Sequence, residues 1–497
     1  MNAAPAHDGV ELAWLLAGLV AAPRIAVRDL KLDSRDVGPG DAFVALAGRS
    51  THGLGHLDEA IARGAVAVIW DPTEGRPLPP LPPAVTAVSV PGLRPELGDV
   101  ADRFYAEPSA DARVAAITGT NGKTTCAWLY AVSHGADGAY MGTLGVGRPP
   151  ALEATRHTTM DVVSVHRTLR ALVDAGARHV AMEVSSHALD QDRVAGLRLP
   201  LAAFTNLTRD HLDYHGTMAA YGAAKARLFQ SRGIEHAIIN VGDAFGRELA
   251  ARLAPGIALT RVASCGAPPA GGRYVFATQV DCRATGLELA GATHAGPFRL
   301  RSPLLGAFNA ENLLVVLGLL LAAELPLGEA LAALGAARPP PGRMETFELG
   351  ARGPTLVVDY AHSPDALAKV LAALRAHTVG ALWCVFGCGG DRDAGKRPLM
   401  AAAAEAGADR LVITDDNPRS EDPERIVAMI SAALTGRVPA HVERDRAAAI
   451  RGAAAQARPG DVILVAGKGH EDYQIYGTEQ RVYSDRDVAR SLAEGAR

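Results

Sequence analysis

The sequence predicts an α/β protein of three domains: a small α/β domain, a domain built on a central parallel sheet, and a Rossmann-like α/β domain. Three observations predict this fold class. The 497 residues are enough for several domains. Short β-rich runs alternate with helix-like stretches through most of the chain, and proline-rich segments divide it into three parts.

The first predicted domain covers residues 1–92. A strand-like run, "AVAVIW", precedes the proline-rich "DPTEGRPLPPLPP", which spans residues 71–83. A second short run, "VTAVSV", follows the prolines. This pattern indicates a small α/β domain.

The second predicted domain covers residues 93–341. Its strand-like runs are "VAAIT", "HVAMEVSS", "LAAFTNL" and "HAIINV", and a helix-like stretch separates each from the next. Strands that alternate with helices predict a parallel, doubly wound sheet. The domain ends at "ARPPPGRME", where three prolines interrupt any helix.

The third predicted domain covers residues 342–497. It contains four more β-rich runs with helical stretches between them: "TLVVDY", "ALWCVFG", "RLVITDD" and "DVILVAG". They predict a second, separate α/β sheet.

Composition excludes several classes of protein. The net charge of −4 gives no electrostatic footprint for nucleic acid. The longest apolar stretch, "LLVVLGLLLAA", is about half as long as a membrane span and predicts a buried helix. The N-terminus lacks the basic region of a signal peptide. Five cysteines, odd in number and without metal-type pairing, indicate reduced thiols and a cytoplasmic location.

The most specific local motif is "ITGTNGKTT", Ile117–Thr125. A strand leads into a glycine-rich turn and then into a helix, whose N-terminal N–H groups favour phosphate oxygens. Lys123 is placed to reach the outer phosphates of a nucleotide, and the Thr124 hydroxyl to bind Mg²⁺. Only two residues separate Gly119 from Gly122, so the loop is shorter than the general template.

Two further residues could hold a metal ion. Glu183 ends a buried-looking strand, where open α/β sheets bind ligands. His211 lies in "FTNLTRDHLDYHG", which follows the next strand; a lone histidine is more often structural. Because Thr124, Glu183 and His211 all follow strands of one predicted sheet, we expect them to converge on one edge. The local pattern around Lys225 predicts only a surface lysine.

The order of the motifs resembles the Mur ligases, the ATP-dependent amide-forming enzymes of peptidoglycan precursor synthesis, which are related to folylpolyglutamate synthase. The resemblance rests on "TGTNGKTT", "EVSSHAL", "TNLTRDHLDYHG", "GAFNAENLL", "GRME" and "DYAHSPD", and on "LDSRDVGPGDAFVALAG" near the N-terminus. It implies one domain each for a UDP-sugar, ATP and an incoming amino acid. We therefore expect small-molecule substrates, no membrane span and a monomer.

The resemblance also implies a mechanism. A D-glutamyl carboxylate attacks the γ-phosphate of ATP and becomes an acyl phosphate, and the amine of the amino acid then displaces phosphate. Lys123 and two Mg²⁺ ions stabilise the charge of the transferred group. By similarity, Thr124 and Glu183 hold the first ion, and His211 and a carbamylated Lys225 hold the second.

Other positions acquire roles only through the resemblance. Asn309, Arg343 and Asp359 match residues that contact adenine, phosphate and ribose, with His362 beside them. His157 stands where many relatives have Asn, and Phe308 where some have His. The loop positions expected to bind ATP are Gly119, Thr120, Asn121, Gly122, Lys123, Thr124 and Thr125. The positions that match the UDP-sugar peptide site are Leu32, Ser34, Arg49, Ser50, Thr51, His157, Thr158, Thr159, Ser185, Gln191 and Arg193.

The amino acid is expected to be read by "DDNPRSEDPE", which begins at Asp415. Alone, this segment predicts a solvated type I turn before a helix. Members of the resembling branch add meso-diaminopimelate or L-lysine, and only the former has a second carboxylate, which suits an Arg fork. We therefore expect diaminopimelate to be added to UDP-N-acetylmuramoyl-L-alanyl-D-glutamate. By resemblance, the pocket consists of Arg392, Asp416, Asn417, Pro418, Arg419, Gly467 and Glu471.

Three alternatives stay open. The chain could be the lysine-adding form or another Mur ligase. It could be a folylpolyglutamate synthase, which shares the ATP loop but does not need the "LDSRDVGPGD" module. It could be a non-catalytic nucleotide-binding protein, although the intact set of Lys123, Thr124, Glu183, His211 and Lys225 argues against that.

Overall fold

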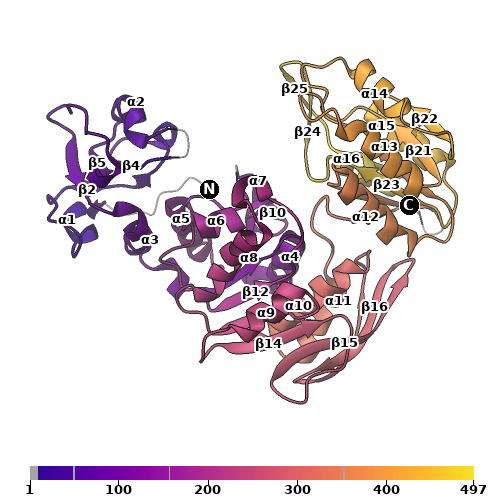
Figure 1. Ribbon diagram of the computed structural model, residues 1–497, viewed down its shortest axis with the longest axis horizontal. Coiled ribbons are helices and arrows are strands. Elements are labelled where there is room, and N and C mark those ends of the chain that lie inside the picture. The colour runs from indigo at the N-terminus through magenta and orange to yellow at the C-terminus, as the bar shows by residue number, and fades with distance from the viewer. Residues whose placement is uncertain (1–8, 49–50, 156, 351–352, 497) are drawn as a thin grey trace. The chain divides into compact units, whose positions relative to one another are not determined.

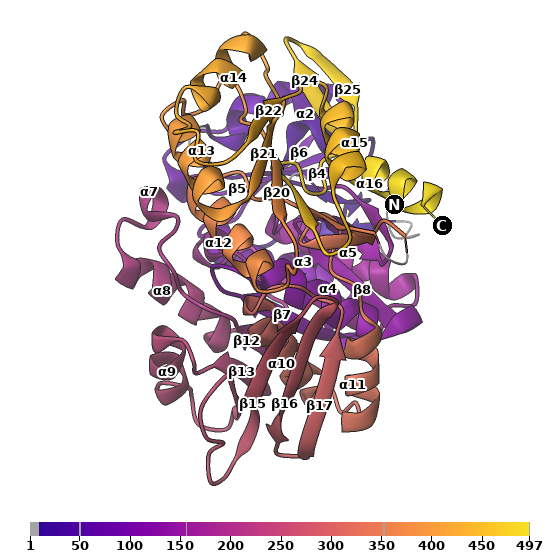
Figure 2. The ribbon, with the colours of Figure 1, turned by 90° about the vertical axis from the view of Figure 1, so that its right-hand side faces the viewer.

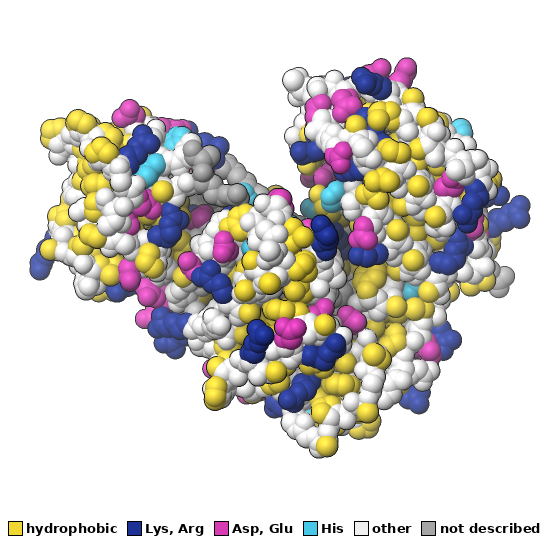
Figure 3. Space-filling model, in the orientation of Figure 1, with side chains coloured by type: hydrophobic (Ala, Val, Ile, Leu, Met, Phe, Trp, Pro, Cys, Tyr) yellow, Lys and Arg dark blue, Asp and Glu magenta, His cyan; other side chains and the backbone are white. Residues whose placement is uncertain are grey.

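The computed structural model describes residues 9–48, 51–155, 157–350 and 353–496. The chain forms two compact units, Met1–Arg261 with Gly318–Leu325, and Val262–Leu317 with Pro326–Arg497. Each unit is described below by itself. Charged side chains of both signs are interspersed over the face shown in Figure 3. Among the described residues, no helix combines the length and apolar character that crossing a membrane requires.

The first unit begins with a small parallel sheet, visible in Figure 1. The predicted run "AVAVIW" supplies its third strand, and helices cover its faces through the apolar side chains of two small cores. The strands, in spatial order, are β3 (Leu30–Lys31), β4 (Ala42–Ala45), β5 (Ala67–Trp70) and β6 (Thr86–Ser89). The helices are α1 (Leu12–Leu15), α2 (Leu57–Ala62) and α3 (Leu93–Phe104), and β1 (Val10–Glu11) pairs with β2 (Ala26–Val27).

The larger sheet of the first unit confirms the predicted parallel arrangement. All four predicted runs are strands, and β7 lies between β11 and β12 with parallel pairing on both sides. The four predicted strands are buried on both faces, which explains their continuous apolar sequences. In spatial order the strands of this part are β10 (Ala151–Glu153), β9 (Gly145–Arg148), β8 (Gly138–Gly142), β11 (His179–Glu183), β7 (Arg113–Thr118), β12 (Leu201–Phe204), β13 (His236–Asn240) and β14 (Ala258–Ala263). At one edge, β9 and β10 pair antiparallel.

The helices of this part connect consecutive strands, and side-chain caps define several of their starts. Asp161 accepts a hydrogen bond from Ser164 N at the start of α5, and Thr217 caps α8 in the same way. The helices are α4 (Lys123–Ser133), α5 (Val162–Asp174), α6 (Ser186–Asp190), α7 (Leu212–His215), α8 (Met218–Ala226) and α9 (Ala244–Ala251).

The second unit opens with an element that the sequence reasoning did not predict. β15 (Arg273–Arg283), β16 (Gly286–Thr293) and β17 (Gly296–Ser302) form an antiparallel meander. Figure 2 shows these strands side by side, and α11 (Leu327–Ala336) packs against β17. The apolar run predicted as a buried helix forms the buried part of α10 (Phe308–Ala322), which confirms that expectation.

The rest of the second unit is the predicted second α/β sheet. Its strands pair in parallel except for β18, which joins the edge antiparallel to β19. Two apolar cores cover its two faces. The strands, in spatial order, are β18 (Glu345–Glu348), β19 (Thr355–Asp359), β23 (Val462–Ala466), β20 (Leu382–Phe386), β21 (Arg410–Ile413) and β22 (Ala440–Val442). The helices are α12 (Pro364–Arg375), α13 (Lys396–Gly407), α14 (Pro423–Ser431), α15 (Arg446–Gln456) and α16 (Asp485–Gly495).

A separate hairpin, β24 (Tyr473–Tyr476) and β25 (Glu479–Val482), follows the last parallel strand. Its Tyr476 forms an isolated parallel bridge with Arg419. The hairpin therefore pairs by its backbone with the loop after β21, which contains residues predicted to bind the amino acid.

Candidate functional site

The glycine-rich loop has the geometry of a phosphate cradle. β7 ends at Thr118 and α4 begins at Lys123, so the loop leads directly into a helix N-terminus. Gly119 has φ of 150°, and a Cβ there would overlap the Thr205 hydroxyl. Gly122 has φ of 87°, a left-handed conformation that favours glycine. Both glycines are therefore required by the backbone path.

Two lysines meet at this loop. The Lys123 ammonium donates to the carbonyl oxygens of Gly119 and Thr120, each at 2.9 Å. The Lys225 ammonium, which comes from α8, donates to the same Gly119 oxygen at 2.7 Å. Two lysine side chains thus converge on one carbonyl oxygen. The charge of Lys123, together with the helix N-terminus, suits a polyphosphate.

The prediction of a surface lysine at position 225 is wrong. The residue is 1% exposed, and its ammonium lies 4.4 Å from the centre of the Tyr221 ring. Burial, and then repulsion from Lys123, lowers the pKa of Lys225 to about 6. Its amine is therefore largely neutral at neutral pH, which makes it a nucleophile.

Glu183 is a buried carboxylate held in one orientation. Its Oε2 accepts from the Thr124 hydroxyl at 3.0 Å, and its Oε1 accepts from Thr143 N at 3.0 Å and from the Tyr140 hydroxyl. The structure thus brings Thr124 and Glu183 together, as expected. Sequence reasoning missed Tyr140, in the middle of β8, and Thr143, which directly follows that strand; β8 lies next to β11 in the sheet.

His211 lies in a cluster of aromatic rings rather than in contact with the Glu183 carboxylate. Its side chain is 47% exposed, and its ring centre lies 4.9 Å from that of His187 and 6.0 Å from that of Tyr221. The Tyr221 hydroxyl lies 3.2 Å from Thr120 Oγ1 in the phosphate loop. Among the described residues, no three His, Cys, Asp or Glu side chains are grouped closely enough to hold a metal ion by themselves.

Several residues predicted for the UDP-sugar peptide adjoin Glu183. Thr159 donates from its hydroxyl to the Glu183 backbone oxygen at 2.9 Å, and Arg193 donates to Thr159 O at 2.7 Å. Gln191 Oε1 accepts from Arg193, while Ser185 caps α6. His157, Thr158, Thr159 and Glu183 line one small cavity.

The remaining predicted positions of that set lie in the N-terminal part of the chain. Leu32 follows β3, and the Ser34 hydroxyl donates to Glu59 Oε2 at 2.7 Å. Thr51 is exposed. Arg49 and Ser50 lie outside the described residues.

In the second unit, Arg343 and Asp359 lie close together. Asp359 accepts from Met344 N at 2.9 Å and from Ala361 N at 2.8 Å, and burial raises its pKa. The Arg343 guanidinium stacks over Tyr360, and its buried Nε lacks a hydrogen-bond partner among the described residues. A buried cationic donor without a partner suits an anionic ligand.

Asn309 and His362, the other residues expected near the nucleotide, lie in the same unit. Asn309, on α10, is buried and donates to Leu305 O at 2.7 Å. His362 is exposed, and its Nδ1 lies 2.8 Å from Tyr360 O.

The segment "DDNPR" is not a solvated turn, which corrects the reading from its local pattern. Asp415, Asp416 and Asn417 are 5%, 8% and 4% exposed. The following "SEDPE" does begin a helix, because Asp422 caps α14. The loop is therefore buried up to Pro418.

Arg419 has an unusual backbone, with φ of 52°. Its N–H donates to Ile475 O at 2.9 Å, and its carbonyl accepts from Gly477 N at 2.6 Å. The guanidinium donates to Gly390 O at 2.9 Å. A Cβ at Gly389 would lie 2.9 Å from Arg419 Nη1 and 3.8 Å from Arg392 Cγ, so the two arginines flank one glycine.

The other predicted pocket residues lie on the same loop face. Asn417 Nδ2 donates to Glu471 Oε2 at 3.1 Å. A Cβ at Gly467, which has φ of 120°, would lie 2.9 Å from Asp416 Oδ2. Sequence reasoning missed Lys468, whose buried ammonium lies among Asp416, Asn417 and Glu471.

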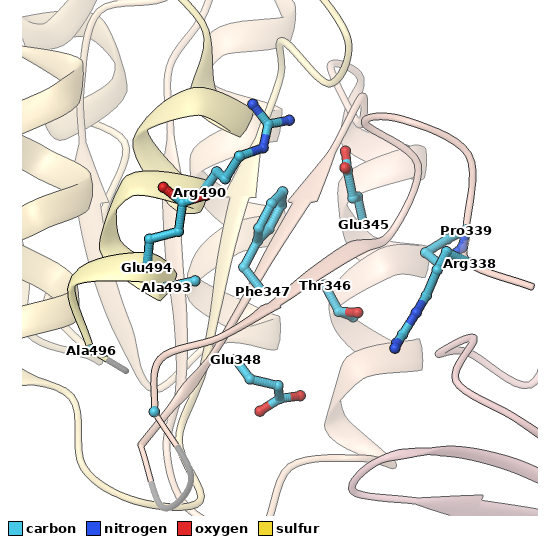
Figure 4. A pocket seen from close by; sticks show the side chains of 11 residues that line it. Arg338, Pro339, Glu345, Thr346, Phe347, Glu348, Arg490, Ala493, Glu494 and Ala496 are labelled. Carbon is cyan, nitrogen blue, oxygen red and sulfur yellow. The ribbon is translucent and has the colours of Figure 1, made fainter. Parts of the chain in front are cut away.

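One sizeable cavity lies away from these residues. It measures about 700 Å³ and lies beside the edge strand β18 and the end of α16, where Figure 4 shows Phe347, Arg490 and Glu345. Its lining includes none of the predicted ligand-binding positions. Size alone therefore does not locate the site.

Taken together, the fold and the loop define a nucleotide-dependent enzyme: a parallel sheet carries a phosphate cradle, two lysines and a buried carboxylate. Three family models match the chain. They are described as Mur ligase family, catalytic domain (residues 27–105), Mur ligase middle domain (residues 117–320), and Mur ligase, glutamate ligase domain (residues 342–469).

Individual relatives agree with these models. The UDP-N-acetylmuramoyl-L-alanyl-D-glutamate--2,6-diaminopimelate ligase of Alkalilimnicola ehrlichii is 49% identical over 484 residues, 94% of this chain and 95% of the relative. The enzyme of the same name from Ectopseudomonas mendocina is 47% identical over 471 residues, 93% and 94% of the two chains. The chain belongs to the Mur ligase family.

Solved structures show the same fold. A structure of UDP-N-acetylmuramoyl-L-alanyl-D-glutamate--2,6-diaminopimelate ligase matches with a TM-score of 0.72 and 36% identity, covering 98% of this chain and 99% of the other. The Mycobacterium tuberculosis folylpolyglutamate synthase, complexed with ADP and AMPPCP, matches at 0.55 and 19% identity over 74% and 91%. The expected family and fold class are thus confirmed.

Proposed function

We propose that this chain uses ATP to join meso-2,6-diaminopimelate to UDP-N-acetylmuramoyl-L-alanyl-D-glutamate, a step of peptidoglycan precursor synthesis. The observation that carries the proposal is the convergence of Lys123, Lys225 and the Thr124–Glu183 pair at the loop after β7. The choice of amino acid is supported by the names of the relatives and by Arg419 beside Arg392.

Activation explains why the reaction needs ATP. A carboxylate is a poor electrophile because its oxygen leaves badly. An oxygen of the D-glutamyl side-chain carboxylate attacks the γ-phosphorus, the bond to the β,γ-bridging oxygen breaks, and ADP and an acyl phosphate form. The amine of diaminopimelate then attacks the acyl carbon, loses a proton, and inorganic phosphate leaves. Lys123 would stabilise the negative charge of the transferred group, and its position at the glycine-rich loop supports this role.

The residues around Glu183 fit Mg²⁺. A hard divalent cation prefers oxygen ligands, and the site offers a buried carboxylate beside a threonine hydroxyl. Thr124 and Glu183 would hold the ion together with phosphate oxygens. Mg²⁺ would there neutralise phosphate charge and polarise the γ-phosphoryl group.

Lys225 fits the proposed carbamylation. Its neutral amine can add to the carbon of CO₂ and lose a proton, which gives an anionic carbamate. Burial stabilises the neutral amine, and the two nearby cations, Lys123 and Mg²⁺, would stabilise the product charge. The carbamate and His211 would then bind a second Mg²⁺.

The other predicted positions complete the proposal. Residues 1–92 would bind the UDP-sugar, residues 93–341 ATP, and residues 342–497 the amino acid. Asn309, Arg343 and Asp359 would contact the nucleotide, for which the partnerless Nε of Arg343 is the supporting observation. We further propose a cytoplasmic location, because the reaction consumes ATP and a UDP-linked substrate, and a monomer, as the resemblance to the family implies.

An amino-acid panel tests the proposal. The purified chain is incubated with ATP, Mg²⁺ and UDP-muramoyl dipeptide, and with meso-diaminopimelate, L-lysine or L-ornithine in parallel. We expect phosphate release and a product that is heavier by one diaminopimelate residue. Turnover with lysine instead would indicate the lysine-adding form. Turnover only with a folate and glutamate would indicate a folylpolyglutamate synthase.

A further inference from the structure

The loop after β23 contains a lysine that the proposed reaction has not used. Lys468 is 0% exposed, yet it follows Gly467 directly and precedes Glu471 by three positions. Removing an ammonium group from water costs several kcal/mol, so a fully buried lysine needs specific partners. Its partners are all residues of the proposed amino-acid pocket.

The ammonium donates two hydrogen bonds and forms one further ion pair. Lys468 Nζ lies 3.0 Å from Asn417 Oδ1, 3.4 Å from Glu471 Oε2 and 3.6 Å from Asp416 Oδ1. The centre of the Tyr473 ring lies 5.6 Å away. A single side chain therefore joins three residues that come from two different loops.

The first consequence is the orientation of Asn417. Its Oδ1 accepts from both Lys468 Nζ and Ile475 N, the latter at 3.0 Å. With both acceptor positions used, the amide must point its Nδ2 toward Glu471, to which it donates. Asn417 can then offer a ligand only an N–H donor.

The second consequence is the charge of the pocket. Asp416 and Glu471 would together present two negative charges, and Lys468 reduces this to one. One net negative charge balances one ammonium of an amino acid. The guanidinium groups of Arg419 and Arg392, around Gly389, remain available for a carboxylate.

We propose that Lys468 is a positioning residue that sets specificity: it orients Asn417 and Glu471 and limits the negative charge around the distal amine, so that an amino acid carrying a second carboxylate is accepted. This inference rests on the proposed function. Diaminopimelate has one more negative charge than lysine, so loss of a buried cation penalises it more.

The experiment compares three variants with the wild type. Lys468→Met keeps the length of the side chain and removes the charge, Lys468→Gln keeps donors without the charge, and Lys369→Met is the matched surface control, because Lys369 is 59% exposed on α12. KM and kcat are measured for meso-diaminopimelate and L-lysine. ADP–ATP isotope exchange, with UDP-muramoyl dipeptide and without an amino acid, reports folding and phosphoryl transfer.

For Lys468→Met we expect a KM for diaminopimelate raised by about tenfold or more, with kcat changed far less. The ratio of kcat/KM for diaminopimelate to that for lysine should fall, and isotope exchange should stay within about twofold of the wild type. Lys468→Gln should lose the preference while KM rises less. Lys369→Met should match the wild type.

Two results would overturn the inference: an unchanged KM for diaminopimelate in Lys468→Met, or equal losses with both amino acids together with lost exchange in both Lys468 variants. Failure of the proposed function looks different, because the wild type itself would then not add diaminopimelate. If it added lysine instead, an unchanged KM for lysine in Lys468→Met would still refute the positioning role.

Discussion

Lys225 and Lys468 show how single residues acquire function through burial. The local sequence around each lysine gives no sign that the residue is buried. Each is removed from water by contacts with residues distant in the sequence. Lys225 meets the carbonyl of a residue 106 positions away, and Lys468 meets an amide 51 positions away. Such contacts are tertiary, so no local pattern predicts them.

Lys225→Ala should abolish most of the ligase activity. The substitution removes both the ammonium contact to Gly119 and the proposed carbamate, and we expect kcat to fall by about a hundredfold or more. Mass spectrometry under native conditions with bicarbonate should show one added CO₂ on the wild type and none on the variant. Normal activity in Lys225→Ala, with unchanged mass in both proteins, would contradict the proposed role.

Arg419→Ala should act on amino-acid binding. A guanidinium that binds a carboxylate through charge-assisted hydrogen bonds contributes about 1.5–3 kcal/mol of binding free energy. KM for diaminopimelate should therefore rise by about tenfold or more. KM for ATP should not change. Arg425→Ala, on the exposed face of α14, is the control. An unchanged KM for diaminopimelate in Arg419→Ala would contradict the proposal that Arg419 binds the second carboxylate.

Among the elements, the contact between α3 and α5 contains a carboxyl group that is costly to ionise. Burial, and then repulsion from Glu107, raises the pKa of Asp102 from 3.8 to about 6, and His166 Nε2 lies 3.7 Å from its Oδ1. Burial lowers the pKa of His166 to about 4, so the histidine is neutral at pH 7 and gives the carboxylate no counter-charge.

Asp102→Asn should therefore stabilise the protein at neutral pH. Because the folded-state pKa is raised, the carboxyl group favours folding below pH 3.8, and that contribution is lost as the pH rises through about 6. At pH 7 we expect a gain of about 1–3 kcal/mol, measured by urea unfolding, and a flatter dependence between pH 4 and 6. Asp365→Asn, which is 78% exposed, should change little; equal behaviour of both variants would refute the account.

Strands were predicted correctly where the sequence contains continuous apolar runs. The continuous apolar runs of β7, β11, β20 and β23 predicted buried parallel strands, because both faces of such strands are covered. The meander β15–β17 was missed because its antiparallel strands follow one another without helices between them, although β17 alternates buried and exposed residues. The hairpin β24–β25 was missed because its outer strand is fully polar apart from Val482.

For the molecule as a whole, the order of the motifs predicted more than any one of them. Thr124 and Glu183 were expected together because both follow strands of one predicted sheet, and the structure pairs those strands side by side. His211 was expected beside them, but its strand end leads into a left-handed turn at φ of 51° that leaves the ring half exposed. Backbone turns of this kind follow from tertiary packing and are not encoded in strand periodicity.

Metal removal tests the whole reaction rather than one residue. Chelation with EDTA should stop phosphate release completely, and added Mg²⁺ should restore it, because Thr124 and Glu183 fit an ion that neutralises phosphate charge. The melting temperature without ATP should change little, since hydrogen bonds already satisfy Glu183. Full activity in metal-free buffer would contradict the assignment.

The hairpin β24–β25 has a consequence for how such an enzyme could change over time. It holds the backbone of residue 419 through the N–H and the carbonyl group, and neither bond depends on the side chain at that position. A substitution at position 419 could therefore change the side chain while the backbone pairing with the hairpin is kept. The identity of the cell-wall building block would then be open to revision by few substitutions, without reconstruction of the domain that carries it.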